Sequence, residues 1–410
     1  MKTEAPVTFL GMTMPRFARW NFFAEGMNTV FSGVFIGIIG PFTLPLAVRM
    51  GATPWQVFII TAIPFIANLL SPIWAHLQQG KQKKWWVVVP HIFWRAGMGL
   101  LGFFKNPAAI TAMQATTNLG LSANATAYGP LMQKVYPAEI RGRLMGYVRL
   151  ILAAFMLPTT LIAGRVIDKH GPQWLFLVGG ICALIGLGFF ALIKEPPETV
   201  AIRAKRGSAL EGLKLAVADQ KFRRFLLAAF LFHGGVLTAV PLYSVFQVRE
   251  MGLTNTQISY ISLCWNIAWL ISFAVWGRLV DQKGARPVVI AAAAFYLGGP
   301  LAYGLVGGFF PLILVAAMCT GIADAAMDMG SLNLILAENP SRVGPYTAAN
   351  LVVSGIRGLL GPLLGSWMLS AFGFRPTFLT AAVLVAAGLA VLVWPDRGRS
   401  AQAQLTAASR

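Results

Sequence analysis

Six charged residues of this chain lie within long apolar stretches, where an ionised side chain is costly. They are Glu25, Arg95, Arg149, Asp324, Asp328 and Arg357. At the centre of a membrane-spanning helix each costs about 2.5–3.5 kcal/mol on an insertion scale, so such residues usually face a bundle interior or a water-filled cavity. Glu25 is the first candidate for chemistry, because its neighbours Phe22, Phe23 and Met27 are apolar. A carboxyl group in that setting could take up and release a proton, and Asp324 and Asp328 are the second choice for this step.

The same six charges also allow a structural explanation, because three acids match three arginines. Asp324 and Asp328 are four residues apart and therefore share one helix face. Arg357 follows in the next apolar stretch and could pair with both. Arg95 could brace neighbouring segments, and Arg149 lies close enough to the end of its stretch to extend its charged head to the surface.

Uncharged polar residues in the same stretches could bind a ligand or join neighbouring helices. With two of the arginines, the candidate binding residues are Asn28, Arg95, Asn118, Asn124, Tyr243, Asn266, Asn350 and Arg357. Aromatic and methionine side chains occur beside them, at Phe31, Phe35, Phe230, Phe246 and Met327. A cavity with few net charges and many such side chains suits amphiphilic or weakly polar molecules, although the same residues equally serve as packing.

The elements that position these residues are helices that span a membrane. The chain has 410 residues, of which 57% are hydrophobic and 11% charged, whereas a soluble domain has about 25% charged residues. A span needs about 20 mostly apolar residues. Twelve spans are predicted, and the first is expected to remain in the protein because it is too long for a signal peptide. The predicted spans are 20–45, 54–75, 85–104, 108–133, 144–164, 173–193, 225–247, 256–277, 288–307, 309–335, 344–370 and 376–394.

The net charge of +19 is explained by its distribution rather than by nucleic-acid binding. Most lysines and arginines fall in the segments that share a side with the N-terminus, which is the positive-inside pattern. Both termini are therefore expected in the cytoplasm, and the basic residues are expected to contact anionic lipid headgroups. Cys182, Cys264 and Cys319 all lie within spans without metal-ligand spacing, so no metal site is expected.

The chain contains an internal repeat. Met50-Gly51-x-Thr53-x-x-Gln56 recurs as Met251-Gly252-x-Thr254-x-x-Gln257, and Trp74 and Lys81 recur as Trp276 and Lys283. Each copy holds six spans, so both copies begin on the same side of the membrane and form parallel repeats. The predicted organisation is a first half at 1–193, a cytoplasmic linker with an amphipathic helix at 194–224, and a second half with a short tail at 225–410.

The loop GRLVDQKGARP, Gly277 to Pro287, is the most specific motif of the chain. Its spelling resembles the loop signature of the major facilitator superfamily of membrane transporters. The resemblance, together with twelve spans and the duplication, implies an all-α membrane fold of two six-helix halves with a substrate site between them. It also implies a cytoplasmic gate in which Asp281 contacts the start of the fifth helix. The residues of that gate are Gly277, Arg278, Asp281, Gly284, Arg286, Arg141 and Arg143.

Two further stretches resemble this loop incompletely. WAHLQQGKQKK, at the equivalent place in the first half, has Gln79 where the second half has Asp281, so the lock is expected to be asymmetric. GRVIDKHGP, Gly164 to Pro172, has nearly the same spelling but falls on the outer side of the predicted topology. We expect that stretch to be an ordinary outer turn with a chance resemblance.

These observations predict a secondary active transporter of the cytoplasmic (inner) membrane. The leading expectation is proton-coupled export of amphiphilic small molecules. The alternatives are uptake or exchange of a small organic anion through Arg95 or Arg357, and a membrane sensor that binds without transport. No HExxH motif or nucleophile elbow is present, so an enzyme is not expected. The expected partners are the substrate and the lipid bilayer, with no nucleic acid and no cofactor beyond an ion gradient, and the chain is expected to be a monomer.

Overall fold

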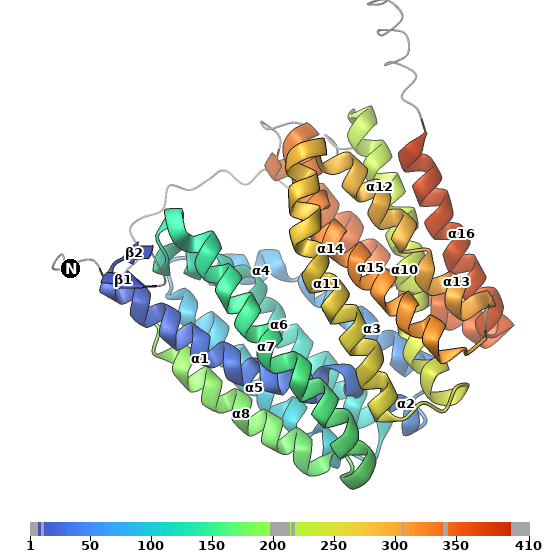
Figure 1. The fold of residues 1–410 in the computed structure, drawn as a ribbon, viewed down its shortest axis with the longest axis horizontal. Coiled ribbons are helices and arrows are strands. Elements are labelled where there is room, and N and C mark those ends of the chain that lie inside the picture. Colours follow the sequence, from blue (N-terminus) through green and yellow to red (C-terminus); the bar gives the residue numbers. More distant parts are fainter. Residues whose placement is uncertain are drawn as a thin grey trace, which may run out of the picture.

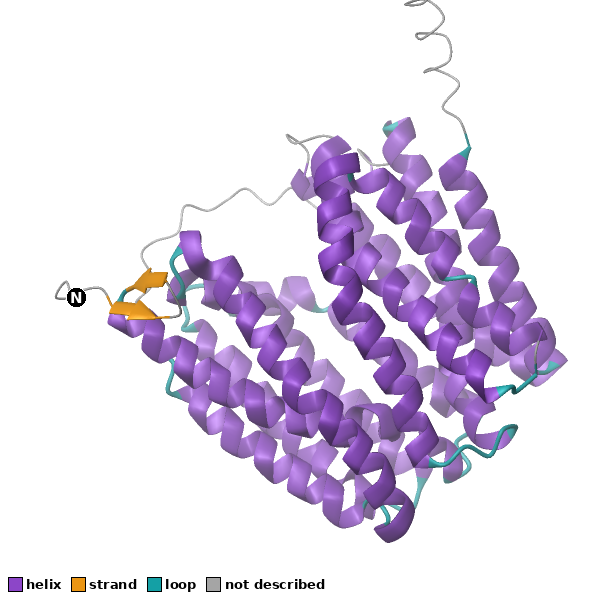
Figure 2. Ribbon diagram, in the orientation of Figure 1, coloured by secondary structure: helices purple, strands orange, loops and turns teal. Residues whose placement is uncertain are grey.

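The computed structural model describes residues 7–9, 12–196, 214, 218–305, 307–338 and 343–394. These residues form two bundles of long helices (Figure 1). A short antiparallel hairpin of strands β1 (Val7–Phe9) and β2 (Met12–Met14) precedes the first helix and was not predicted (Figure 2). The amphipathic helix predicted within 194–224 falls almost entirely outside the described residues.

The first half contains the six predicted spans. The first begins in α1 and continues through a 3-10 turn into α2, and the second is divided between α3 and α4. The elements are α1 (Arg16–Ile39), η1 (Gly40–Phe42), α2 (Thr43–Arg49), α3 (Pro54–Asn68), α4 (Ser71–Leu77), α5 (Lys83–Leu100), η2 (Leu101–Phe103), α6 (Pro107–Val135), α7 (Ala138–His170) and α8 (Gln173–Ala191).

The second half repeats this plan with one span divided in two. Its helices are α10 (Gln220–Arg249), α11 (Asn255–Lys283), α12 (Ala285–Phe295), α13 (Gly298–Leu305), α14 (Phe310–Glu338), α15 (Val343–Phe372) and α16 (Phe374–Val393). Among the described helices, ten spans meet both the length and the hydropathy expected for crossing a membrane. The other two are the divided α3–α4 span and α6, whose polar residues lower its hydropathy. The prediction of an all-α membrane fold with twelve spans is confirmed.

The repeated Met-Gly-x-Thr-x-x-Gln motif marks the start of an equivalent helix in each half. Thr53 and Gln56 form a capping box at the start of α3, and Thr254 and Gln257 form the same box at the start of α11. In a capping box the threonine hydroxyl and the glutamine amide satisfy two backbone N–H groups that the helix leaves unpaired. The repeat found in the sequence is therefore a repeated helix start.

Each half has its own apolar core. Phe22 lies in a cluster confined to the first half, and Phe232 lies in one confined to the second. A third apolar cluster joins the halves, because Phe35 of the first half shares it with Val245 of the second. Each half therefore has a core of its own, and the third cluster is one of the contacts that hold the halves together.

The halves converge at one end of the molecule and diverge at the other (Figure 1). We call the end where α7 ends and α11 begins the far end, and the end where α8 ends and α10 begins the linker end. Close packing at the far end depends on Gly164, because a Cβ atom there would lie 2.8 Å from the carbonyl oxygen of Asn255 in α11.

Candidate functional site

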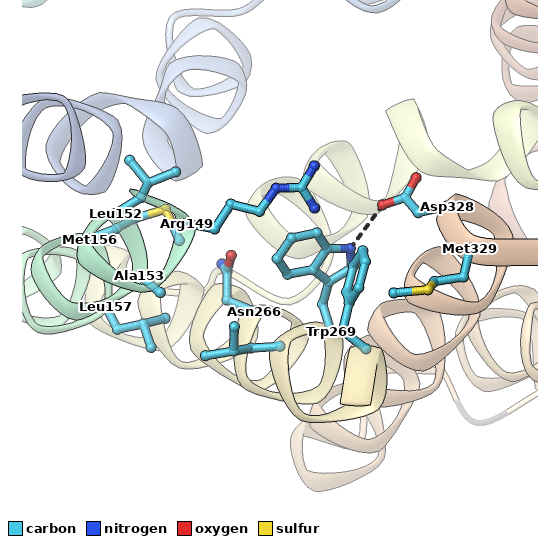
Figure 3. Close-up of a pocket in the computed structure, with 11 residues that line it drawn as sticks. Arg149, Leu152, Ala153, Met156, Leu157, Asn266, Trp269, Asp328 and Met329 are labelled. Carbon is cyan, nitrogen blue, oxygen red and sulfur yellow. Dashed lines mark hydrogen bonds between the residues drawn. The ribbon is translucent and has the colours of Figure 1, made fainter. Parts of the chain in front are cut away.

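A cavity of about 560 Å³ lies between the two halves. Its walls come from α7 of the first half and from α11 and α14 of the second (Figure 3). Cavities of about 300–1,000 Å³ are the usual size of small-molecule sites. The lining residues are Arg149, Leu152, Ala153, Met156, Leu157, Asn266, Trp269, Leu270, Phe273, Asp328 and Met329.

Two opposite charges occupy opposite walls of this cavity. Arg149 extends from α7 and Asp328 from α14 (Figure 3). The guanidinium of Arg149 lies 5.7 Å from the ring centre of Phe273, and the Asp328 carboxylate accepts a hydrogen bond of 3.2 Å from the indole of Trp269. Within the described part of the chain neither residue forms an ion pair, although they are close enough to interact electrostatically.

Two tryptophans of α11 hold the two aspartates of α14. Trp265 donates to Asp324 at 2.8 Å and Trp269 donates to Asp328 at 3.2 Å. The two tryptophans are four residues apart in α11, and the two aspartates are four residues apart in α14. One face of α11 therefore matches one face of α14. Asp324 also accepts from the Tyr296 hydroxyl at 2.6 Å and, unlike Asp328, is not one of the residues that line the cavity.

Glu25 lies inside the first half, where only 1% of its surface is exposed. The Tyr128 hydroxyl donates to one carboxylate oxygen at 2.5 Å, and the Tyr136 hydroxyl donates to the other. Both tyrosines belong to α6 or its C-terminal end, whereas Glu25 belongs to α1. Among the described residues no basic side chain pairs with Glu25. Arg149 is close enough to interact electrostatically with Tyr128 as well as with Asp328.

The arginines do not pair with the acids as the structural explanation required. Arg95 is 4% exposed and bonds to Asn28, Ser32 and the carbonyl of Ala183, so it does brace its own half. Arg357 donates to the carbonyl of Ala229 and to Ser354 rather than to Asp324 or Asp328. Arg149 points into the cavity instead of toward a helix end. The expected pairing is therefore wrong for the described chain, because the helix rotations direct these side chains elsewhere.

Arg357 also borders a second cavity of about 610 Å³. Its walls are almost wholly apolar and come from α3, α10, α15 and α16, with Trp55 and Trp367 among them. No acidic residue lines this second cavity, and it shares no lining residue with the cavity between α7, α11 and α14.

The remaining polar candidates are divided among several places. Only Asn266 lines the cavity between the halves. Asn28 is used by Arg95, Asn118 bonds to Gln114 within α6, and Tyr243 stacks on Tyr303 with ring centres 4.3 Å apart. Asn124 has a buried oxygen without a partner, and Asn350 is partly buried on α15.

The predicted contact between Asp281 and the start of α7 is not formed. Asp281 is exposed at the end of α11, and no hydrogen bond joins it to α7 in the described residues. Arg141 bonds to carbonyls of Gln133 and Tyr136 within its own half, Arg286 approaches the carbonyl of Leu392, and Arg143 and Arg278 are exposed. The halves are apart at this end, so the gate assigned to Gly277, Asp281 and Gly284 stays a prediction.

The halves are instead joined at the far end by Asp168. Its carboxylate accepts bonds of 2.8 Å from the backbone N–H groups of Asn255 and Thr256, and further bonds from both side chains. Asp168 belongs to GRVIDKHGP, so the expectation of an ordinary outer turn is wrong. Two arginines add reciprocal contacts at the same end, because Arg49 donates to the Leu253 carbonyl and Arg249 to the Ala52 carbonyl, each at 2.6 Å.

Sequence reasoning missed Arg149, Trp269 and Phe273 as cavity residues. One signal was available for the tryptophans, since Trp265 and Trp269 have the same spacing as Asp324 and Asp328. Arg149 stands out in the sequence as a charge within an apolar stretch, but its position near the end of that stretch favours the surface, and its true direction depends on how α7 packs against α11.

The sequence of this chain is similar to those of known membrane transporters. The model of the Major Facilitator Superfamily matches residues 26–254 and 225–409. A proposed tartrate transporter of Agrobacterium vitis is 22% identical over 338 residues, which cover 75% of this chain and 77% of that protein. The multi-drug resistance efflux pump PmrA of Streptococcus pneumoniae serotype 4 is 24% identical over 377 residues, which cover 87% of this chain and 90% of that protein.

Solved structures agree on the fold. A bacterial homologue of the human lysosomal transporter Spinster, in an inward-facing and unoccupied conformation, superposes with a TM-score of 0.67 at 13% identity. The superposition covers 92% of this chain and 96% of that one. At this identity the likeness establishes the fold alone.

Proposed function

Because the chain belongs to the Major Facilitator Superfamily, we propose that it is a secondary active transporter that exports amphiphilic small molecules in exchange for protons. The halves would rock about a site near the middle of the membrane and expose it to each side in turn. By the positive-inside pattern the linker end is cytoplasmic, with both termini inside, and the membrane is the cytoplasmic one. The arrangement described above then corresponds to a state open to the cytoplasm.

The cavity between the halves is the proposed substrate site. Residues from both halves line it, which a site of alternating access requires. Trp269, Phe273, Met156 and Met329 supply aromatic and polarisable walls, and thioether side chains adapt to ligands of different shape. One relative is named as a multi-drug resistance efflux pump, which agrees with a site of this composition.

The environment of Glu25 is the observation that carries proton coupling. An arginine partner would hold the carboxylate charged throughout the cycle, whereas the two tyrosine hydroxyls leave it able to bind a proton. The Tyr128 hydroxyl joins Glu25 at 2.5 Å and is within electrostatic reach of Arg149. A proton arriving at Glu25 would change the field at Arg149, and thereby the binding of substrate in the cavity.

A transport assay with Glu25→Gln tests this coupling. The variant is reconstituted in proteoliposomes, and substrate flux and proton movement are measured under an imposed pH gradient. We expect the proton movement that is exchanged for substrate to fall at least tenfold, while substrate counterflow without a gradient continues. Glu250→Gln is the matched control, because Glu250 is exposed at the end of α10. Unchanged gradient-driven flux with unchanged pH dependence in Glu25→Gln would contradict the proposal.

Transport of a small organic anion is the second candidate, because one relative is named as a proposed tartrate transporter. Neither arginine first considered for that function favours it, since Arg95 bonds within its own half and Arg357 borders an apolar cavity. In the same proteoliposomes, flux of tartrate without flux of an amphiphilic dye such as rhodamine 123 would favour this candidate. Binding without flux under any gradient would favour a sensor.

A further inference from the structure

We propose that the cavity between α7, α11 and α14 binds a zwitterionic aromatic amphiphile, with its anionic group at Arg149 and its cationic group at Asp328. This inference rests on the proposed transport function and narrows its substrate class. It starts from the observation that the two charges of the cavity lie on opposite walls and form no ion pair with one another or with any other described residue.

The partners of the two charges leave both available to a ligand. Asp328 receives one indole hydrogen bond, which leaves most of its acceptor capacity unused. Among the described residues Arg149 contacts the ring face of Phe273 and donates no hydrogen bond, so its N–H donors remain available. A ligand with a single charge would pair with the charged residue on one wall. The charged residue on the opposite wall would then be left unpaired or would face a like charge. A ligand with both charges satisfies the two walls together.

Between the charges the cavity is aromatic. Phe273 and Trp269 are in edge contact with ring centres 4.6 Å apart. Phe273 contacts Arg149 and Trp269 bonds to Asp328, so the two rings connect the two charges. A planar ring system that separates the two charged groups of the ligand would stack on these rings. Because Arg149 belongs to the first half and Asp328 to the second, such a ligand would draw the halves together.

Three dyes with one common ring skeleton test the charge requirement. Rhodamine 110 is zwitterionic at neutral pH, its methyl ester rhodamine 123 is cationic, and fluorescein is anionic. Binding to the purified protein is measured by fluorescence polarisation, which does not depend on transport. We expect rhodamine 110 to bind about tenfold tighter than either of the others, as a charged hydrogen bond contributes. Equal affinity for the three dyes would overturn the proposal.

Two substitutions assign each charge to its wall. Asp328→Asn keeps an acceptor for Trp269 and should remove the preference for rhodamine 110 over fluorescein. Arg149→Gln should remove the preference for rhodamine 110 over rhodamine 123, while Arg149→Lys retains it. If dye binding follows this pattern but no dye is transported, the transport proposal fails and the charge assignment stands. If dyes are transported without this pattern, the charge assignment fails.

A second inference comes from the two ends of α7 and α11. GRVIDKHG at the end of α7 and GRLVDQKG at the end of α11 share the pattern Gly-Arg-x-x-Asp-x-x-Gly. Each helix ends at the last glycine of its motif, where φ is +76° at Gly171 and +81° at Gly284. We infer that the motifs are a matched pair of latches, one for each end of the antiparallel α7–α11 pair.

The geometry of Asp168 shows how such a latch works. Its carboxylate caps the start of α11, where the helix dipole and unpaired N–H groups favour an anion. Gly164, one turn earlier, permits the close approach. Gly277 and Asp281 have the same spacing at the end of α11, so they would approach the start of α7 when the linker end closes. Asp168 would then release α11, and the two latches would be formed alternately.

Spin labels at exposed positions of the linker end test the exchange. With the three cysteines replaced by alanine, Gln79→Cys and Lys221→Cys are labelled and their distance distribution is measured. We expect Asp168→Ala to shift the ratio of open to closed linker ends toward closed by about tenfold. Asp281→Ala should shift it toward open, and the double variant should return near the wild-type ratio. Lys169→Ala is the control and should change nothing.

No shift in Asp168→Ala, or a shift of Asp168→Ala and Asp281→Ala in the same direction, would overturn the paired latch.

Discussion

At the scale of single residues, the partner determines what a carboxylate can do. Glu25 is held by two tyrosine hydroxyls, Asp328 by one indole, and Asp168 by backbone N–H groups of a helix start. The first arrangement suits reversible protonation, the second leaves capacity for a ligand, and the third is a mechanical contact. Residue type alone does not distinguish the three.

The arginines divide in the same way. Arg95 satisfies Asn28, Ser32 and the Ala183 carbonyl inside the first half, whereas Arg149 has no hydrogen bond among the described residues. A charged side chain whose donors are used by its own half is a brace. A charged side chain that has no hydrogen-bond partner and faces a cavity is a candidate for contact with a ligand.

Replacement of Arg95 by lysine tests this division. Lysine keeps the charge but cannot reproduce the planar fork of donors, so at least one buried acceptor is left unsatisfied. We expect the free energy of unfolding in detergent to fall by about 1–3 kcal/mol, measured by thermal or chemical unfolding, with dye affinity nearly unchanged. Arg149→Lys is the control and should leave stability unchanged. Normal stability of Arg95→Lys with lost binding would instead identify Arg95 as a substrate contact.

At the scale of elements, the repeated sequence motifs are helix ends. The Met-Gly-x-Thr-x-x-Gln repeat places a capping box at the start of α3 and α11. The Gly-Arg-x-x-Asp-x-x-Gly motifs lie at the ends of α7 and α11. Helix ends carry unpaired N–H or carbonyl groups, and they are therefore the natural places for contacts that can break and re-form between two halves.

The helices α7 and α11 together contribute to the cavity, to both latch motifs and to the contact between the halves. They supply Arg149 and Trp269 to the cavity, they carry both latch motifs, and Gly164 allows their close packing at the far end. A tilt of one helix against the other would change the cavity and the latches together. Substrate binding and gate closure are thus expected to be linked through this pair.

At the scale of the whole molecule, each half has a core of its own, and the two halves share a third apolar cluster. Asp168, Arg49 and Arg249 all make their contacts between the halves at the far end. The bonds from Arg49 and Arg249 are reciprocal because each arginine is the last residue of the helix that completes the first span of its half. Such an arrangement lets the linker end open while the far end stays closed.

Cysteine labelling in intact cells tests the proposed orientation. Lys105 is exposed at the far end and Gln79 at the linker end. With the three native cysteines replaced, Lys105→Cys should react with a membrane-impermeant maleimide from outside. Gln79→Cys should react only after the cells are permeabilised. The reverse result would place the linker end outside, and the exchange of protons for substrate would have to be reassigned in direction.

The sequence by itself determined the twelve spans, the duplication and the family. These depend on local properties, namely the length and hydropathy of each segment and the spelling of short motifs, and each can be read within some 20–30 residues. It also identified Glu25, Asp324 and Asp328 as unusual, because a charge in an apolar segment is visible without any partner.

Only the tertiary structure decided which of these residues act together. Glu25 meets Tyr128 across 103 residues of chain, and Asp168 meets Thr256 across 88. Such contacts depend on the rotation and tilt of helices that pack against one another, and a rotation of one residue turns a side chain by about 100°. For this reason Arg149, which was expected to reach a helix end, lines the cavity instead. The motif at Gly164 to Pro172, which was expected to be a chance resemblance, supplies the contact that closes the far end.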